Sequence, residues 1–126
     1  MKTLQTLATA VLFTLCTIEI SSAENSVFTD IQNDVKGIPS DMSASNYIFA
    51  AGVTLGIANY ELKLKSQKLI YCQPYELSLS LKDYQKITLK AYNRNKIKFD
   101  KLETDNPLVA MSMALTKGME NEFPCY

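Results

Sequence analysis

The final stretch of the chain, "DNPLVAMSMALTKGMENEFPCY" (105–126), predicts both a helix and the element that ties its end down. Asp105 or Asn106 can cap a helix start, and Pro107 suits the first turn. Apolar residues then recur at helical spacing until Pro124 ends the pattern, and a cysteine follows at once. A chain end that would otherwise fray therefore carries a group that can form a covalent link. The apolar stripe of this helix comprises Leu108, Met111, Leu115 and Met119.

The first 23 residues have the pattern of a signal peptide: a basic start, an apolar run over 7–18, and Ser21 and Ala23 ahead of the cleavage point. The run is too short for a membrane span. Cys16 lies inside it, which argues against a lipid anchor. We therefore expect export to the periplasm and a soluble mature chain, with one domain over residues 24–126.

Removal of the signal peptide leaves two cysteines, Cys72 and Cys125, in an oxidising compartment. A bond between them would close a long loop and contribute roughly 4 kcal/mol on the chain-entropy model. A reactive thiol is the alternative, but it needs a neighbouring His, cation or helix start, and the chain has no His. We predict a structural disulfide that tethers the C-terminus.

Two further helices are predicted. Residues 24–39 read as an extended or weakly helical lead-in, and a first helix follows over about 41–62. Gly52 and Gly56 within it suggest close approach by another backbone, either in the core or at a homodimer face. The expected stripe is Tyr47, Ala50, Ala51, Thr54, Leu55 and Ala58.

Pro74 rules out an ordinary helix around the first cysteine of the mature chain, so residues 69–72 are expected to be briefly extended. A helix then starts near Ser78 or Ser80, where Asp83 completes a capping-box pattern. Its stripe is Leu81, Tyr84, Thr88, Ala91 and Tyr92. The fold class is all-α: a small helical domain of about three to four helices with one disulfide.

Composition excludes several kinds of partner and chemistry. Thirteen basic residues balance thirteen acidic ones, so neither nucleic acid nor a membrane surface is the expected partner. Without His, the commonest catalytic base and metal ligand are missing. The acidic group Asp100, Glu103 and Asp105 lacks the spacing of a calcium loop and is expected to be a solvated connection between helices. We predict no catalytic residue, no metal site and no cofactor.

Loop tyrosines favour recognition of a protein. Tyr84 and Tyr92 have core spacing and are expected to be buried, whereas Tyr60, Tyr71 and Tyr75 lie nearer the loops around the first cysteine of the mature chain. Amphipathic aromatic side chains on loops are frequent anchors of protein interfaces.

The order of "AAGVTLGIAN", "YCQP", "LKDYQKITLKAYNRN" and "NPLVAMSMALTKGMENEFPC" resembles the Rap/Tai family of type VI secretion immunity proteins. The resemblance covers about Tyr47 to Cys125. Its most specific pieces are Cys72-Gln73-Pro74 and Phe123-Pro124-Cys125. It implies a small, helical, disulfide-bonded periplasmic protein that binds a cognate peptidoglycan amidase and blocks it sterically, without turnover of its own.

The residues expected to contact such an effector flank the disulfide and follow the second helix: Tyr71, Gln73, Tyr75, Arg94 and Lys98. They are expected to be exposed, and they include tyrosine and arginine, which are frequent at the hot spots of protein interfaces. Two other classes stay open. A periplasmic chaperone or stress protein would bind many unfolded clients. An enzyme would use its carboxylates on cell-wall fragments.

Overall fold

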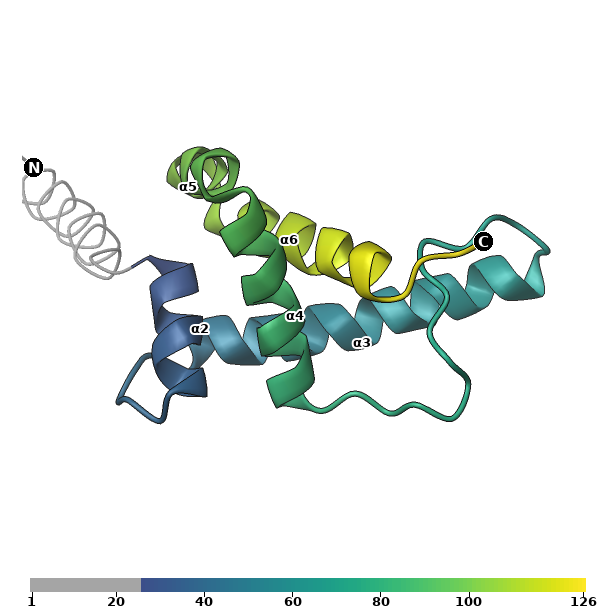
Figure 1. The fold of residues 1–126 in the computed structure, drawn as a ribbon, viewed down its shortest axis with the longest axis horizontal. Coiled ribbons are helices and arrows are strands. Elements are labelled where there is room, and N and C mark those ends of the chain that lie inside the picture. Colours follow the sequence, from purple (N-terminus) through teal and green to yellow (C-terminus); the bar gives the residue numbers. More distant parts are fainter. Residues whose placement is uncertain (1–25) are drawn as a thin grey trace, which may run out of the picture.

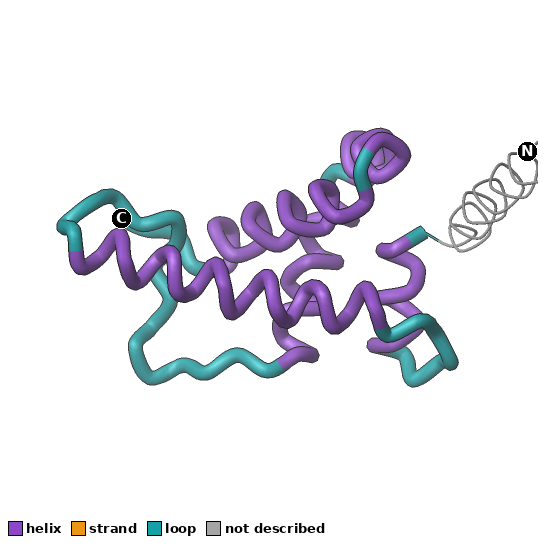
Figure 2. The backbone as a smooth tube through the Cα atoms, turned by 180° about the vertical axis from the view of Figure 1, so that it is seen from behind, coloured by secondary structure: helices purple, strands orange, loops and turns teal. Residues whose placement is uncertain are grey.

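The computed structural model describes residues 26–126, so the predicted signal peptide lies outside the described residues. The described part is all-helical, as predicted, and contains no strand (Figures 1 and 2). It has five helices, whereas the sequence predicted three to four. They are α2 (Val27–Val35), α3 (Ser43–Leu64), α4 (Leu81–Arg94), α5 (Lys96–Asp105) and α6 (Pro107–Glu122). No helix within this part is long and apolar enough to cross a membrane.

The core lies where α4 meets α6, and α2, α3 and α5 pack around this pair. Ser80 caps α4 in a reciprocal capping box with Asp83, as the sequence predicted. Asn106 caps α6 by accepting a hydrogen bond from the backbone N–H of Val109. The predicted stripes of both helices are buried except at their first residues: Leu81 is half-buried and Leu108 is exposed.

The helix α2 corrects the expectation of an extended lead-in. It buries Phe28 and Ile31 in the core, and the Phe28 ring stacks on Tyr92 with 4.1 Å between centroids. No side chain of α2 caps its own start. Instead the Glu103 carboxylate accepts hydrogen bonds from the Val27 backbone N–H at 2.7 Å and from the Ser26 hydroxyl at 2.9 Å. Tertiary contacts therefore stabilise a helix of only nine residues.

The helix α5 corrects the expectation of a solvated connection. Phe99 anchors it in the core against Phe28 and Tyr92. Two of the three acidic residues assigned to that connection have structural contacts. Glu103 holds the start of α2, and Asp100 accepts hydrogen bonds from the Tyr92 hydroxyl and the Lys96 ammonium.

The buried face of α3 is not the predicted stripe, because Ala50, Thr54 and Ala58 are exposed. Ser45, Ile48 and the other buried positions lie in the first half of the helix, where it crosses α4 (Figure 1). A glycine is required at position 52 because an aromatic ring, and not another backbone, lies against it. A Cβ on Gly52 would lie 2.6 Å from Tyr84 Cε1, whereas one on Gly56 would meet only the Tyr71 hydroxyl at 3.6 Å.

The predicted disulfide joins Cys72 to Cys125 and closes a sequence separation of 53 residues. The Cα atoms are 5.0 Å apart, an ordinary span for such a bond. Beside it, the Cys72 backbone N–H donates to the Phe123 carbonyl at 2.8 Å. The end of α6 is therefore fixed to the connection between α3 and α4, as Figure 2 shows from behind.

Candidate functional site

The connection between α3 and α4, residues 65–80, has no regular structure but is held at several points; we call it the tethered loop. Asn59 on α3 binds its backbone twice. The Asn59 amide donates to the Tyr71 carbonyl at 2.9 Å, and the Ile70 backbone N–H donates to the Asn59 Oδ1 at 2.8 Å. With the disulfide and the bond to Phe123, these contacts fix the loop on both sides of Cys72.

Tyr71 is part of this attachment, and the prediction that it is exposed was wrong. Only 3% of it is accessible, because the ring packs into the core against Phe123 and beneath α3 at Gly56. Burial raises the pKa of the Tyr71 hydroxyl. Its side chain anchors the loop from inside and is not available to a partner.

The tip of the tethered loop is ordered yet open to solvent. A turn brings the Leu77 backbone N–H to the Pro74 carbonyl at 3.1 Å, and the Gln73 amide donates to the Leu77 carbonyl. Tyr75, between them, is 98% exposed. A tyrosine held out on a fixed turn offers a large contact area at low entropic cost.

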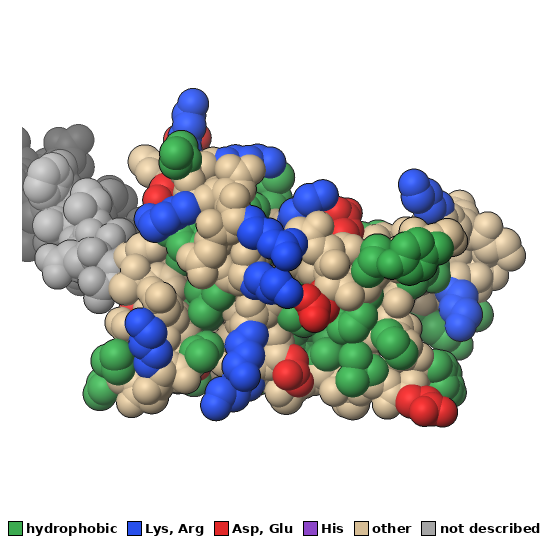
Figure 3. All heavy atoms as spheres, viewed as in Figure 1, with side chains coloured by type: hydrophobic (Ala, Val, Ile, Leu, Met, Phe, Trp, Pro, Cys, Tyr) green, Lys and Arg blue, Asp and Glu red, His purple; other side chains and the backbone are tan. Residues whose placement is uncertain are grey.

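A hydrophobic surface on α3 adjoins the tethered loop. This surface was not predicted from the sequence. We call it the α3 stripe: Phe49, Val53, Ile57, Tyr60 and Leu64. These residues follow one another at helical spacing, and their exposed fractions range from 43% to 67%. Val53, Ile57 and Tyr60 form a groove with Tyr75 and Leu77 of the loop. Figure 3 shows hydrophobic side chains gathered to the right of α4, toward the C-terminus.

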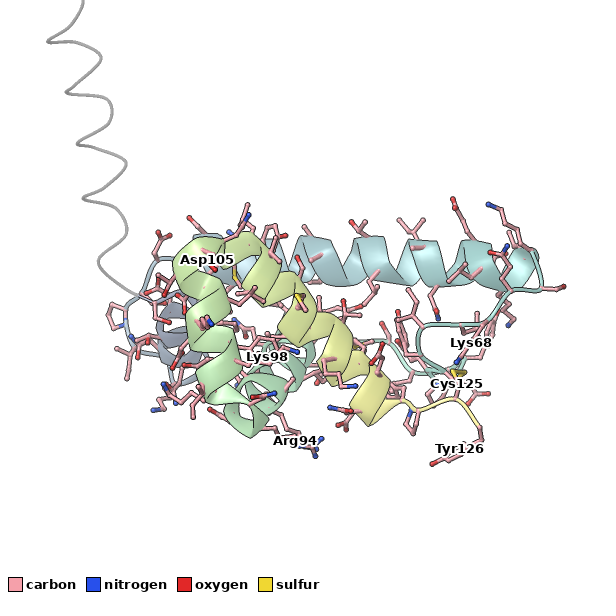
Figure 4. The ribbon with its side chains drawn as sticks, turned by 90° about the horizontal axis from the view of Figure 1, so that it is seen from above. Lys68, Arg94, Lys98, Asp105, Cys125 and Tyr126 are labelled. Atoms are coloured by element: carbon pink, nitrogen blue, oxygen red, sulfur yellow. A yellow bond between two sulfur atoms is a disulfide. The ribbon has the colours of Figure 1, made fainter. Side chains whose placement is uncertain are left out.

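Arg94 and Lys98, the other two predicted contact residues, lie elsewhere. They are exposed and line a second groove, between the α4–α5 corner and α6, whose floor includes Leu108, Val109 and Met113. Figure 4 shows Arg94 and Lys98 at that corner and Cys125 at the far end of α6. The structure therefore separates the five predicted residues: Tyr71 is buried, Gln73 and Tyr75 lie on the tethered loop, and Arg94 and Lys98 line the second groove. Only Gln73 and Tyr75 share the first surface in a position accessible to a partner.

No group of three or more acidic or cysteine side chains within residues 26–126 is placed to hold a metal ion. The Lys96 ammonium and the Tyr92 hydroxyl, both hydrogen-bonded to Asp100, lower the pKa of its carboxyl. Asp100 therefore stays ionised and keeps its structural contacts. The described surface also carries exposed large apolar side chains, in the α3 stripe and beside the second groove.

Comparison of the chain with protein-family models, with curated proteins and with solved structures finds no match.

Proposed function

We propose that the mature chain is a periplasmic immunity protein that binds a cognate type VI secretion peptidoglycan amidase and inhibits it sterically. It would protect the cell against its own effector and against that of sister cells. The observation that supports this proposal most is the ordered tethered loop. A disulfide, the buried Tyr71 and two hydrogen bonds with Asn59 fix the loop, and Tyr75 projects from it fully into solvent.

A steric inhibitor needs a surface that is already in its bound shape. Each residue ordered on binding costs free energy, so a loop fixed in advance retains more of its contact energy as affinity. The tethered loop meets this requirement at its base and at its turn. Tyr75 is then the anchor expected to enter the cleft of the amidase, and Leu77 and the α3 stripe are expected to pack around the cleft rim.

The compartment assigned to the protein agrees with its chemistry. A disulfide such as the one that ties the tethered loop to the C-terminus forms and persists in oxidising surroundings, as in the periplasm. The motifs around the two cysteines are also the most specific part of the resemblance to immunity proteins.

Binding calorimetry with type VI secretion peptidoglycan amidases from the same cell tests the proposal. We expect a one-to-one complex, which Tyr75→Ala weakens by about 2 kcal/mol, or roughly thirtyfold. Ile97→Ala is the matched control, because Ile97 is a large exposed apolar residue on α5, outside both grooves. Absence of binding by the unaltered protein would contradict the proposal.

The α3 stripe supports a second candidate, a periplasmic chaperone for unfolded clients. Exposed apolar side chains in a continuous row are what such clients bind. This function predicts suppression of aggregation of unrelated denatured proteins, and loss of that effect in Val53→Ser/Ile57→Ser. A homodimer would also bury the α3 stripe. The oligomeric state of the purified protein is therefore measured by sedimentation alongside the aggregation assay.

A further inference from the structure

The outer face of α4 carries basic side chains at regular spacing. Lys82, Lys86, Lys90 and Arg94 follow one another at intervals of four residues, and Lys98 comes next on α5. Residues four apart lie on one side of a helix. All five are exposed, and Figure 3 shows a column of Lys and Arg side chains over α4. We call these five residues the basic ridge.

Most of this charge has no acidic partner in the part of the chain that the structure describes. Lys90 pairs with Glu122 at 3.3 Å, but the other four cations form no ion pair there. Asp83, the one acidic residue on α4, is engaged in the cap with Ser80. Because acidic and basic residues balance over the whole chain, the ridge is a local excess of positive charge.

We propose that the basic ridge docks an acidic segment of the protein partner. The inference deepens the proposed function, on which the identity of that partner rests. At its Arg94 end the ridge opens into the groove along α6, where Leu108, Val109 and Met113 are exposed beside Lys98. Among the described residues that line this groove, Glu120 is the one carboxylate, and it is already paired with Lys117. The segment that fits therefore carries carboxylates along the ridge and apolar side chains at the groove.

An anionic membrane fits the ridge less well than an acidic protein does. A helix that binds a membrane lays an apolar face into the lipid. The apolar face of α4 is instead buried in the core, where Tyr84, Ile87 and Tyr92 lie. Along α4, from Lys82 to Arg94, no exposed apolar residue lies between the cations, and the exposed Ile97 follows on α5 beside Lys98. The cations along α4 therefore offer a polar contact surface. An acidic protein segment can match this surface in shape as well as in charge.

Complementary charge acts mainly on the rate of association, because it steers the approach of the two partners. We therefore measure the association rate of the full mature protein with the amidase at several salt concentrations. Lys86→Glu/Arg94→Glu is expected to slow association about tenfold at low salt and to abolish its salt dependence. Lys36→Glu/Lys101→Glu makes the same charge change at exposed positions outside the ridge, the tethered loop and both grooves, and it should slow association less than about twofold. Equal slowing by both variants would overturn the inference and leave the proposed function standing.

A second measurement decides the inference even if the amidase does not bind. The mature protein is titrated with a synthetic peptide rich in Glu and Leu, with the same peptide carrying Gln for Glu, and with phosphatidylglycerol vesicles. We expect the Glu peptide to bind at least about tenfold more tightly than the Gln peptide and to lose that advantage in Lys86→Glu/Arg94→Glu. Equal binding of the two peptides would overturn the inference. So would tight vesicle binding that depends on the ridge, because it would assign the surface to lipid.

Discussion

The carbonyl oxygen of Ile87 in α4 lies 2.7 Å from the position that a Cβ on Gly118 in α6 would occupy. The side-chain Cγ2 of Ile87 is equally close. This contact sets the distance between the two central helices, and only a glycine permits it. A residue that would weaken an isolated helix by about 1 kcal/mol is therefore required by the packing.

Gly118→Ala is expected to destabilise the protein by about 1–3 kcal/mol, despite its better helix propensity. The obstructing atom belongs to the backbone of α4, which cannot move without disturbing the core. Urea unfolding of the mature protein measures the change. An unchanged or higher midpoint would show that the two helices are not held this close.

Gly52 and Gly56 in α3 should respond in opposite directions to the same substitution. A Cβ at Gly52 would lie 2.6 Å from the buried ring of Tyr84, so Gly52→Ala should cost about 1–3 kcal/mol. A Cβ at Gly56 would meet the Tyr71 hydroxyl at an ordinary 3.6 Å, so Gly56→Ala should gain about 0.5–1 kcal/mol of helix propensity. Thermal unfolding compares the two. A shift of both variants in one direction would contradict this account of α3.

The disulfide is expected to contribute a large share of the stability. Cys72→Ser/Cys125→Ser should lower the free energy of unfolding by roughly 4 kcal/mol, because the closed loop no longer restricts the unfolded chain. The same variant frees the base of the tethered loop, so its affinity for the amidase should fall as well. Detection of two free thiols in the denatured, unaltered protein would refute the bond directly.

Asp100 should make stability fall in acid. Its carboxylate is hydrogen-bonded by Lys96 and Tyr92, which lowers its pKa in the folded protein below the usual value of 3.8. Its contribution to stability is therefore complete above that value, and it is lost as pH falls through the lower folded pKa. Asp41 and Asp83 act in the same sense through their hydrogen bonds with serines, whereas burial raises the pKa of Asp30 and opposes them.

Melting temperature measured between about pH 6 and pH 2 tests this dependence. Asp100→Asn should melt at a lower temperature than the unaltered protein near neutral pH and should lose less on acidification. Asp105→Asn, on the same helix but without a hydrogen-bonded partner for its side chain in the described part of the chain, is the control. Parallel curves for the unaltered protein and Asp100→Asn would show that Asp100 does not contribute.

Local chemistry was sufficient to predict α4, α6 and the disulfide. The capping box of Ser80 and Asp83, the cap and first turn at Asn106 and Pro107, and the pair of cysteines left in the mature chain are all short-range signals. Such signals are read from adjacent residues and do not depend on the rest of the fold.

The remaining features depend on contacts between distant parts of the chain. The helices α2 and α5 are short and pack mainly on α3, α4 and α6, with aromatic and carboxylate contacts between them such as that of Glu103 with Val27. Tyr71 is buried because Asn59, twelve residues earlier, binds the loop backbone. The basic ridge could have been found from sequence, since its four-residue spacing becomes visible once α4 is assigned.

We propose that this protein inhibits a peptidoglycan amidase by occupying its cleft. The decisive experiment follows cleavage of peptidoglycan by the cognate amidase while the mature protein is added. We expect a linear loss of activity that reaches zero at one equivalent and a shallower loss with Tyr75→Ala. Undiminished cleavage in the presence of excess protein would contradict it.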